Sequence, residues 1–302
     1  MNKKNSIVLA GLLLSASALM ANTNNLKQEV SSISLQKEKT QKEQNRLDNI
    51  VKNTITDHKK QLQHEQGFVL GIQKMVLAMK SLSNEDKNTA KDKLLEAAKS
   101  IRDAFQKEPN MKMVPVYDKE MIHVFNGSVE LINKIRDYSY VLVKDNEIQT
   151  AIDVLTPMQD EIVMTTSYLP VYLYPEAIKE AQYKIDIGDL KGAKDVLYKA
   201  LNMLEVKQVI IPIPLITAQD MIVEASKLDK SKKDEIMKLL SAAKYELKRA
   251  VALGYTKKYN VDYLSLNNQI EKMEKDLGLK KDIKSSFEKI IKDFKGLIHK
   301  IS

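Results

Sequence analysis

The stretch Glu161–Gln219 constrains the fold of this 302-residue chain most strongly. It holds two apolar runs that contain prolines, Tyr168–Tyr174 and Val209–Ile216, and helical patterns lie between them. Residues alternate in Tyr168–Tyr174, whereas Val209–Ile216 is a short continuous apolar run, and both patterns predict extended chain. Pro212 and Pro214 are two residues apart, so in a strand their missing N–H groups would lie along one edge, which could not donate to a neighbour. We therefore do not expect a large sheet.

A third run, Met111–Tyr117, has the same character, and we predict a small seam of two or three short extended segments inside a helical protein. Both alternating sets of the Val209–Ile216 run are apolar, which predicts burial on both faces. The chain has only 9 Gly and 7 Pro, which suits helices. It has no Cys, which excludes disulfides and thiolate metal sites.

Pairs of amphipathic patterns joined by short polar turns fill most of the remaining chain. The second pattern of four pairs carries small and apolar residues at helical spacing: Ala90, Leu94 and Ala97; Ala151, Leu155 and Met158; Ala193, Leu197 and Ala200; Ile236, Leu240 and Ala243. Small residues at these offsets let paired helices approach closely, as in tetratricopeptide-like pairs. We predict an all-α fold of divergent antiparallel helical hairpins, with a small seam of proline-containing extended segments.

The N-terminal 21 residues are typical of a secretory signal peptide. Two lysines precede an apolar run, Ile7–Ala18, which is too short to span a membrane, and small residues follow it. Cleavage after Ala21 is the preferred prediction and cleavage after Ala18 the alternative. We therefore expect an exported protein of the periplasm. The formal net charge of +8 is mild for this length, and nucleic acid is not an expected partner.

After residues 1–21, we predict a polar helical or partly disordered segment over residues 22–66, a helical-hairpin core domain over 67–279 and a basic amphipathic helix over 280–302. This last segment has seven lysines and an apolar stripe at helical spacing. The favoured interpretation is that the stripe packs on the protein body. The alternative is contact with a partner or a membrane through Phe287, Lys289, Lys292 and Phe294.

One group of polar and aromatic residues suggests a ligand site. It comprises Thr165, Thr166, Tyr168, Tyr172 and Tyr174. A tyrosine-rich edge beside an apolar seam offers ring faces and hydroxyl groups to a ligand. The alternative is packing in the core, which is the commoner fate of such side chains.

No residue pattern predicts catalysis, a cofactor or a metal. The four histidines include His58 and His64, but a spacing of six does not place them on one helix face. Asp160 and Glu161 are adjacent, so in extended chain they point apart, and we expect them to be solvated or capping residues. A phosphate loop, a nucleophile elbow and a dinucleotide fingerprint are all absent from the sequence.

Four segments in a fixed order resemble the YfdX family of exported bacterial proteins: EIVMTTSYLPVYLYPEAI, IGDLKGAKDVLYKALNML, VIIPIPL and LLSAAKYELKRAVALGY. The resemblance covers Gly67–Leu277. It implies a mostly helical, soluble, periplasmic protein that is loosely linked to envelope stress, and it brings no agreed catalytic residues. The polar N-terminal segment and the basic last helix are where the chain departs from such relatives.

We therefore expect a non-enzymatic periplasmic protein, either a stress-related binding module or a chaperone-like one. The alternative is a structural or adaptor protein that docks an envelope partner or a membrane surface through its terminal helices. The expected partner is a protein or a small molecule, and self-association is a further alternative.

Overall fold

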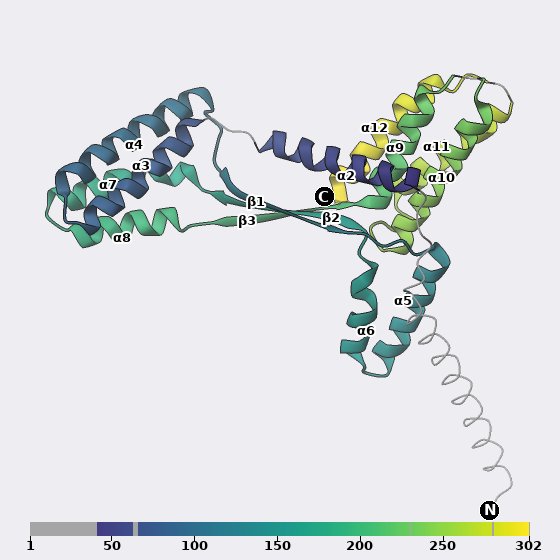
Figure 1. Ribbon diagram of the computed structural model, residues 1–302, viewed down its shortest axis with the longest axis horizontal. Helices are drawn as coiled ribbons and strands as arrows, with labels where there is room; N and C mark the ends of the chain where they lie inside the picture. The colour runs from purple at the N-terminus through teal and green to yellow at the C-terminus, as the bar shows by residue number, and fades with distance from the viewer. Residues whose placement is uncertain (1–40, 63–65, 230, 280, 302) are drawn as a thin grey trace, which may run out of the picture. The chain divides into compact units, whose positions relative to one another are not determined.

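The computed structural model describes residues 41–62, 66–229, 231–279 and 281–301. The predicted signal peptide, the first part of the polar segment and His64 lie outside these ranges. The described chain is mostly helical and has one small sheet, which confirms the helical prediction in its coarse form (Figure 1). The chain forms two compact units. The first comprises residues 53–121 and 164–209. The second comprises residues 122–163 and 210–302, together with the chain up to residue 52.

The unit of residues 53–121 and 164–209 is built on two helix pairs. The pairs are α3 (Gln66–Ser83) with α4 (Lys87–Lys107), and α7 (Tyr174–Asp186) with α8 (Leu190–Leu201). Helix α3 also packs on α8, and α4 packs on α7, so the four helices enclose one apolar core. A Cβ at Gly71 of α3 would lie 2.4 Å from Ile101 of α4, so the helices approach closely there.

Local sequence signals set the turns of these pairs. The carboxylate of Asp86 accepts a hydrogen bond from Thr89 N, and Asp189 accepts one from Gly192 N, so each begins a helix as its N-cap. Gly188 has a φ of +85°, a left-handed conformation that glycine adopts without steric cost. The predicted polar turns therefore have ordinary capping chemistry.

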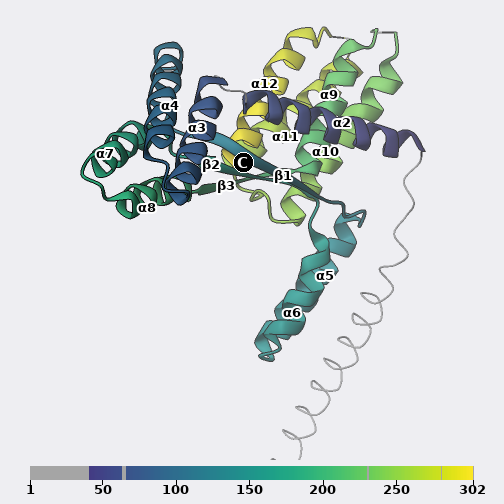
Figure 2. The ribbon, with the colours of Figure 1, turned by 60° about the vertical axis from the view of Figure 1, so that its left-hand side comes forward.

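The second unit contains a four-helix bundle and a separate helix pair. The bundle is formed by α9 (Ile213–Lys227), α10 (Lys233–Ala252), α11 (Val261–Gly278) and α12 (Lys284–Ile301), around one apolar core. The pair is α5 (Val129–Lys144) with α6 (Ile148–Leu155), followed by the 3₁₀ turn η1 (Thr156–Met158) (Figure 2). Helix α2 (Gln41–Gln61) contributes its first half to this unit, where Arg46 pairs with Asp220 and Glu224 of α9.

Helix α12 packs on α9 and α11 along its apolar stripe. Phe287, Ile290, Phe294 and Leu297 are all buried in the bundle core. The prediction that the C-terminal helix docks on the protein body is therefore confirmed. Among the described residues, no helix has the length and apolarity that crossing a membrane requires.

The sheet consists of β1 (Val114–His123), β2 (Glu161–Leu169) and β3 (Glu205–Pro212), in the order β1-β2-β3. β1 and β3 each begin in the first unit and end in the second. β2 begins in the second unit and ends in the first. Neighbouring strands therefore run antiparallel, as the chain path in Figure 1 shows. The prediction of a small seam of three extended segments is confirmed.

The predicted ends of two extended segments were wrong. Tyr172 lies in the 3₁₀ turn η2 (Val171–Leu173), and Tyr174 begins α7. Pro212 ends β3 and is the N-cap of α9, so Pro214 falls in the first turn of that helix. A first-turn helical residue has no intrahelical partner for its N–H, so proline is tolerated there as well as at a sheet edge.

The prediction that the Val209–Ile216 run is buried on both faces holds in part. Pro212–Ile216 are buried, whereas Val209, Ile210 and Ile211, which lie in β3, are half-buried. β3 has one neighbour, β2, so it is an edge strand. The buried apolar residues of the Val209–Ile216 run are therefore mainly those that α9 places in the bundle.

Candidate ligand pocket and polar clusters

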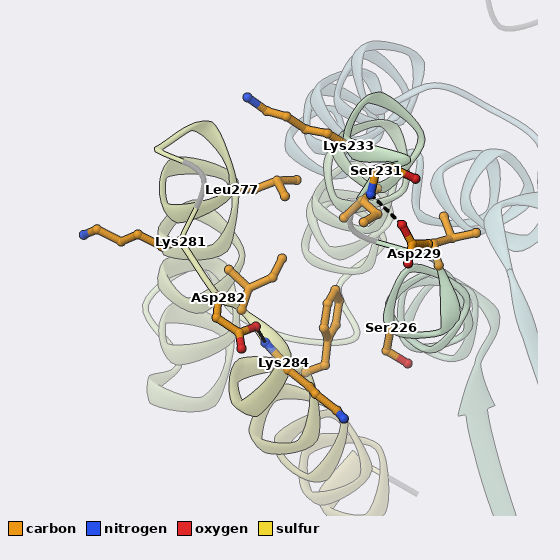
Figure 3. A pocket seen from close by; sticks show the side chains of 12 residues that line it. Ser226, Asp229, Ser231, Lys233, Leu277, Lys281, Asp282 and Lys284 are labelled. Carbon is orange, nitrogen blue, oxygen red and sulfur yellow. Dashed lines mark hydrogen bonds between the residues drawn. The ribbon is translucent and has the colours of Figure 1, made fainter.

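A pocket of about 590 Å³ opens at one end of the α9–α12 bundle (Figure 3). The connection from α9 to α10 and the connection from α11 to α12 form its mouth. Its apolar lining consists of Leu228, Ile236, Leu277, Ile283 and Phe287. Its polar lining consists of Ser226, Asp229, Ser231, Lys233, Lys281, Asp282 and Lys284. The pocket therefore combines an apolar floor with a charged rim.

The two rim carboxylates are used to shape the connections. Asp229 Oδ1 accepts a hydrogen bond from Ser231 N at 2.9 Å, and Asp282 Oδ1 accepts one from Lys284 N at 3.0 Å. Each carboxylate thus holds a turn of its own backbone, as Asp commonly does at the start of a helix. One oxygen of each carboxylate is thereby engaged, and the rim presents both carboxylate and ammonium groups to a ligand.

The three lysines differ in their direction. Lys233 Nζ lies 3.4 Å from the carbonyl oxygen of Gly278, across the mouth of the pocket. Lys281 points away from the space in Figure 3 and lies 3.4 Å from the carboxylate of Asp276. Lys284 is exposed at the beginning of α12. Lys233 and Lys284 are therefore the cations best placed for an anionic or hydrogen-bonding group.

This pocket could not be predicted from the sequence, because its floor and rim come from four helices and two connections. A sequence cue existed in the Asp and Lys residues clustered around each connection, but such clusters are usually solvated turns. Phe287 was singled out as a partner or membrane contact. The structure instead buries it, and its ring lines this pocket.

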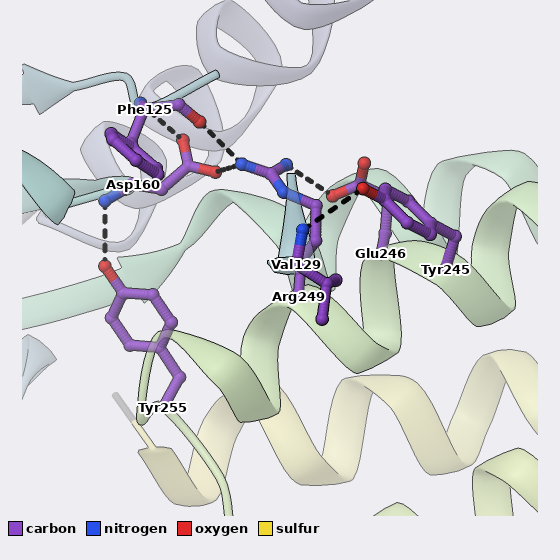
Figure 4. A network of polar contacts seen from close by, with 7 residues as sticks. All are labelled: Phe125, Val129, Asp160, Tyr245, Glu246, Arg249 and Tyr255. Atoms are coloured by element: carbon purple, nitrogen blue, oxygen red, sulfur yellow. Dashed lines mark hydrogen bonds and ion pairs between the residues drawn. The ribbon is translucent and has the colours of Figure 1, made fainter. Parts of the chain in front are cut away.

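A buried ion-pair network lies in the same unit (Figure 4). Arg249 of α10 donates from Nη2 to Asp160 Oδ2 at 3.0 Å and to the Phe125 carbonyl oxygen, and from Nη1 to Glu246 at 2.8 Å. Asp160 Oδ1 accepts from Phe125 N at 3.3 Å. The Tyr255 hydroxyl accepts from Asp160 N, and burial raises the pKa of this tyrosine above its usual value.

This network corrects the expectation that Asp160 and Glu161 are solvated. Asp160 is completely buried and Glu161 nearly so. Both oxygens of Asp160 are held by donors, and its partner Arg249 is only 5% exposed. A carboxylate in this state is not available as an acid or a base. We therefore assign the network a structural role: it links Phe125, just after β1, and Asp160, just before β2, to α10.

A second polar cluster lies in the unit that contains α3 and α4. The Thr166 hydroxyl donates to Asp118 at 2.8 Å, and His58 Nε2 lies 3.4 Å from that hydroxyl and 3.6 Å from Asp118. The neighbouring Glu120 has its pKa lowered by a hydrogen bond from Lys59. The Thr166 hydroxyl donates its hydrogen bond to the Asp118 carboxylate rather than to His58, so the arrangement differs from that of an activated nucleophile. No group of three His, Cys, Asp or Glu residues in the described ranges is placed to hold a metal.

The predicted tyrosine-rich site does not form one groove. Thr166 is buried in the polar cluster, and Thr165 accepts a weak hydrogen bond from Gln208. The Lys207 ammonium lies 5.4 Å from the centre of the Tyr168 ring, and Tyr172 is 53% exposed. Tyr174 is completely buried in the core, where burial raises its pKa. The residues separate because the strand ends at Leu169 and the chain then turns into helix.

The residues predicted for partner contact on the last helix also separate. Phe294 is completely buried and Phe287 is 6% exposed, so neither is presented on the surface. This part of the prediction was wrong, because the apolar stripe faces the bundle. Lys289 and Lys292 are exposed on the opposite side of α12.

Comparison with known proteins gives one family. The family model described as YfdX protein matches residues 72–210. A search of solved structures finds a structure of Salmonella Typhi YfdX, at 11% sequence identity and a TM-score of 0.33. The alignment covers 50% of this chain and 93% of that one. No curated protein sequence matches the chain.

Proposed function

We propose that this chain, whose residues 72–210 match the YfdX family model, is a non-enzymatic binding protein whose α9–α12 pocket receives a small molecule with an apolar body. The observation that carries the proposal is the pocket of about 590 Å³ with five apolar side chains in its lining. This volume falls within the usual range for small-molecule sites, about 300–1,000 Å³. The pocket lies outside the residues matched by the family model, so the proposal rests on its geometry.

The rim supplies the polar end of the proposed ligand. Lys233 and Lys284 can donate to an anionic or acceptor group, while Asp229 and Asp282 are oriented by hydrogen bonds from backbone N–H groups. A ligand that places an apolar body on the floor and an acceptor group at the rim is an amphipathic molecule. We place this binding activity in the periplasm and in envelope stress, on the basis of the basic and apolar N-terminus and the family resemblance.

We also propose that the helix pairs follow tetratricopeptide-like packing. The close approach of α3 and α4 at Gly71 and Ile101 supports this relation, since small residues permit such contacts. A chaperone-like role would use the same apolar pocket surface for segments of unfolded chains.

Calorimetric titration with 1-anilinonaphthalene-8-sulfonate tests the pocket, because this probe has an apolar aromatic body and one sulfonate. We expect saturable binding to the parent protein. Ser226→Trp places a large ring in the mouth of the pocket and should weaken binding at least about tenfold, a loss of about 1.4 kcal/mol. Asn268→Trp adds the same ring at an exposed position of α11 and should leave the affinity unchanged.

Melting curves of both variants establish that they fold as the parent does. Equal affinities in the parent, Ser226→Trp and Asn268→Trp would show that the probe does not use the pocket. In that case the proposed site is wrong.

A second candidate function is that of an adaptor that contacts an anionic surface through α12. The observation that favours it is the exposure of Lys289 and Lys292 while the apolar stripe of the same helix is buried. A basic face of this kind attracts anionic lipid or an acidic partner through charge alone. Because salt screens this attraction, binding of the protein to anionic vesicles should be lost at high ionic strength.

A further inference from the structure

A second and smaller cleft lies between α4 and α7, in the unit that does not contain the first pocket. It encloses about 330 Å³. Four residues of each helix line it: Ala98, Ile101, Arg102 and Phe105 of α4, and Pro175, Ile178, Lys179 and Gln182 of α7. The two sets have the same sequence offsets, which place each set along one face of its helix. The cleft is therefore a groove between two matching helix faces.

The floor of the cleft is apolar. Ile101 and Ile178, at the second position of their sets, close the bottom of the cleft and are each only 1% exposed, so the apolar surface that a ligand can reach is that of Ala98, Phe105 and Pro175. Phe105 is half-buried and packs edge-on against Phe68, with the ring centres 5.0 Å apart. This contact gives the aromatic wall a defined position. A ligand that enters the cleft therefore meets hydrocarbon below it and at one side.

The rim of the cleft carries two positive charges and no carboxylate. Arg102 and Lys179 occupy the third position of their sets, and both are exposed. Within the part of the chain that the structure describes, neither cation is in an ion pair. Other cations nearby are paired, as Lys91 is with Asp186 and Lys184 is with Asp189. An anion is the ligand that this uncompensated charge favours.

From these observations we propose that the α4–α7 cleft binds a short apolar monocarboxylate. The carboxylate lies between the Arg102 guanidinium and the Lys179 ammonium, and the hydrocarbon tail covers Ala98, Phe105 and Pro175. A guanidinium can donate two parallel N–H groups to one carboxylate, which a point charge cannot do. Inorganic phosphate would leave the apolar floor uncovered, and a cationic amphipath would be repelled by the rim. The volume is at the lower end of the range for ligand pockets, which limits the tail to a short one.

This site is independent of the α9–α12 pocket, and it lies entirely within the residues that match the family model. The two sites can therefore be tested separately. The test of this cleft compares ligands that have the same hydrocarbon tail and differ in charge. Octanoate, 1-octanol and octylamine are a suitable set, because they share a tail and differ only in their polar end.

Amide chemical shifts of the full chain, followed by nuclear magnetic resonance during titration with octanoate, locate the site. We expect the largest changes in residues 98–105 and 175–182. The double variant Arg102→Gln with Lys179→Gln should weaken octanoate binding at least about tenfold, because both charge-assisted hydrogen bonds are lost. Its affinity for 1-octanol should change less than about twofold, because the apolar floor is intact.

The control is Lys199→Gln, which removes an exposed lysine of α8 outside the cleft and should leave octanoate binding unchanged. Ser226→Trp should also leave the shift changes of α4 and α7 intact, even if the first pocket is closed. The proposal is overturned if octanoate perturbs only the α9–α12 bundle, if octylamine binds as tightly as octanoate, or if the double variant retains the parent's affinity. All substituted residues here are exposed, and melting curves establish that the variants fold.

Discussion

Arg249 shows at the residue scale how a buried charge is accommodated in this protein. Its guanidinium is held by the carboxylates of Asp160 and Glu246 and by the carbonyl oxygen of Phe125. Burial alone would favour the neutral form of each ionisable group, and the mutual contacts oppose that effect. The stability of the network therefore depends on all of its members being present.

Arg249→Met should lower the free energy of unfolding by about 3 kcal/mol, because it leaves the buried Asp160 carboxylate without its cation. Urea denaturation measures this change. Lys248→Met is the matched control on the same helix, where the side chain is exposed, and should stay within about 0.5 kcal/mol of the parent. If Arg249→Met and Lys248→Met lower the free energy of unfolding by the same amount, the network does not stabilise the fold.

Glu96 gives a pH dependence at the residue scale. Hydrogen bonds from Lys74 and Lys93 lower its pKa from 4.5 to about 2. The folded state therefore favours the ionised carboxylate, and its contribution to stability is present above about pH 4.5 and is lost as the pH falls toward about 2. Because the Glu96 side chain is 42% exposed and solvent screens its ion pairs, we expect the effect to be modest.

Glu96→Gln should therefore melt at a lower temperature than the parent at pH 7 and at the same temperature near pH 2. Calorimetric scans across this range test the prediction. Asp103→Asn, at an exposed position of the same helix, is the control, and its difference from the parent should not vary in this way. A difference for Glu96→Gln that persists unchanged at pH 2 would contradict the assigned cause.

Helix α12 is the most informative case at the scale of elements. Its apolar stripe is buried against α9 and α11, and its lysines cover the outer side. An amphipathic helix gains most of its stability from such packing rather than from its own hydrogen bonds. The helix therefore belongs to the bundle and also supplies one wall of the pocket through Phe287.

Phe294→Ala should lower the free energy of unfolding by about 3 kcal/mol, because it removes a completely buried ring from the bundle core. Chemical denaturation provides the measurement. Lys292→Ala, two residues away on the exposed side, should change stability by less than about 0.5 kcal/mol. Similar small effects for both variants would mean that α12 does not depend on its apolar stripe.

At the scale of the whole molecule, only one of the two candidate sites falls within the residues that match the family model. The matched residues 72–210 include α4 and α7 and therefore the smaller cleft. The larger pocket is formed by residues 226–287, beyond the match. Ligand binding at the smaller cleft would thus be a candidate property of the matched region, whereas the larger pocket lies outside that region.

The sequence by itself determined the features that depend on neighbouring residues. Helix existence followed from apolar spacing, turns from Asp and Gly, and the docked last helix from its stripe, because each pattern repeats within a few residues. The ends of the extended runs were ambiguous for a local reason. A proline such as Pro214 suits a sheet edge and a first helical turn equally well, and only the packing of α9 distinguishes them.

The tertiary structure alone decided the features that depend on distant residues. Arg249 meets Asp160 across 89 positions and Phe125 across 124, so no local pattern could show that Asp160 is buried. The two cavities arise in the same way, since each is enclosed by side chains of helices that are separated in the chain. The tyrosines at 168, 172 and 174 were grouped by a period of two, but the chain leaves the strand after Leu169 and sends them to different surroundings. Side-chain periodicity holds only while the backbone conformation continues, and tertiary packing sets where it ends.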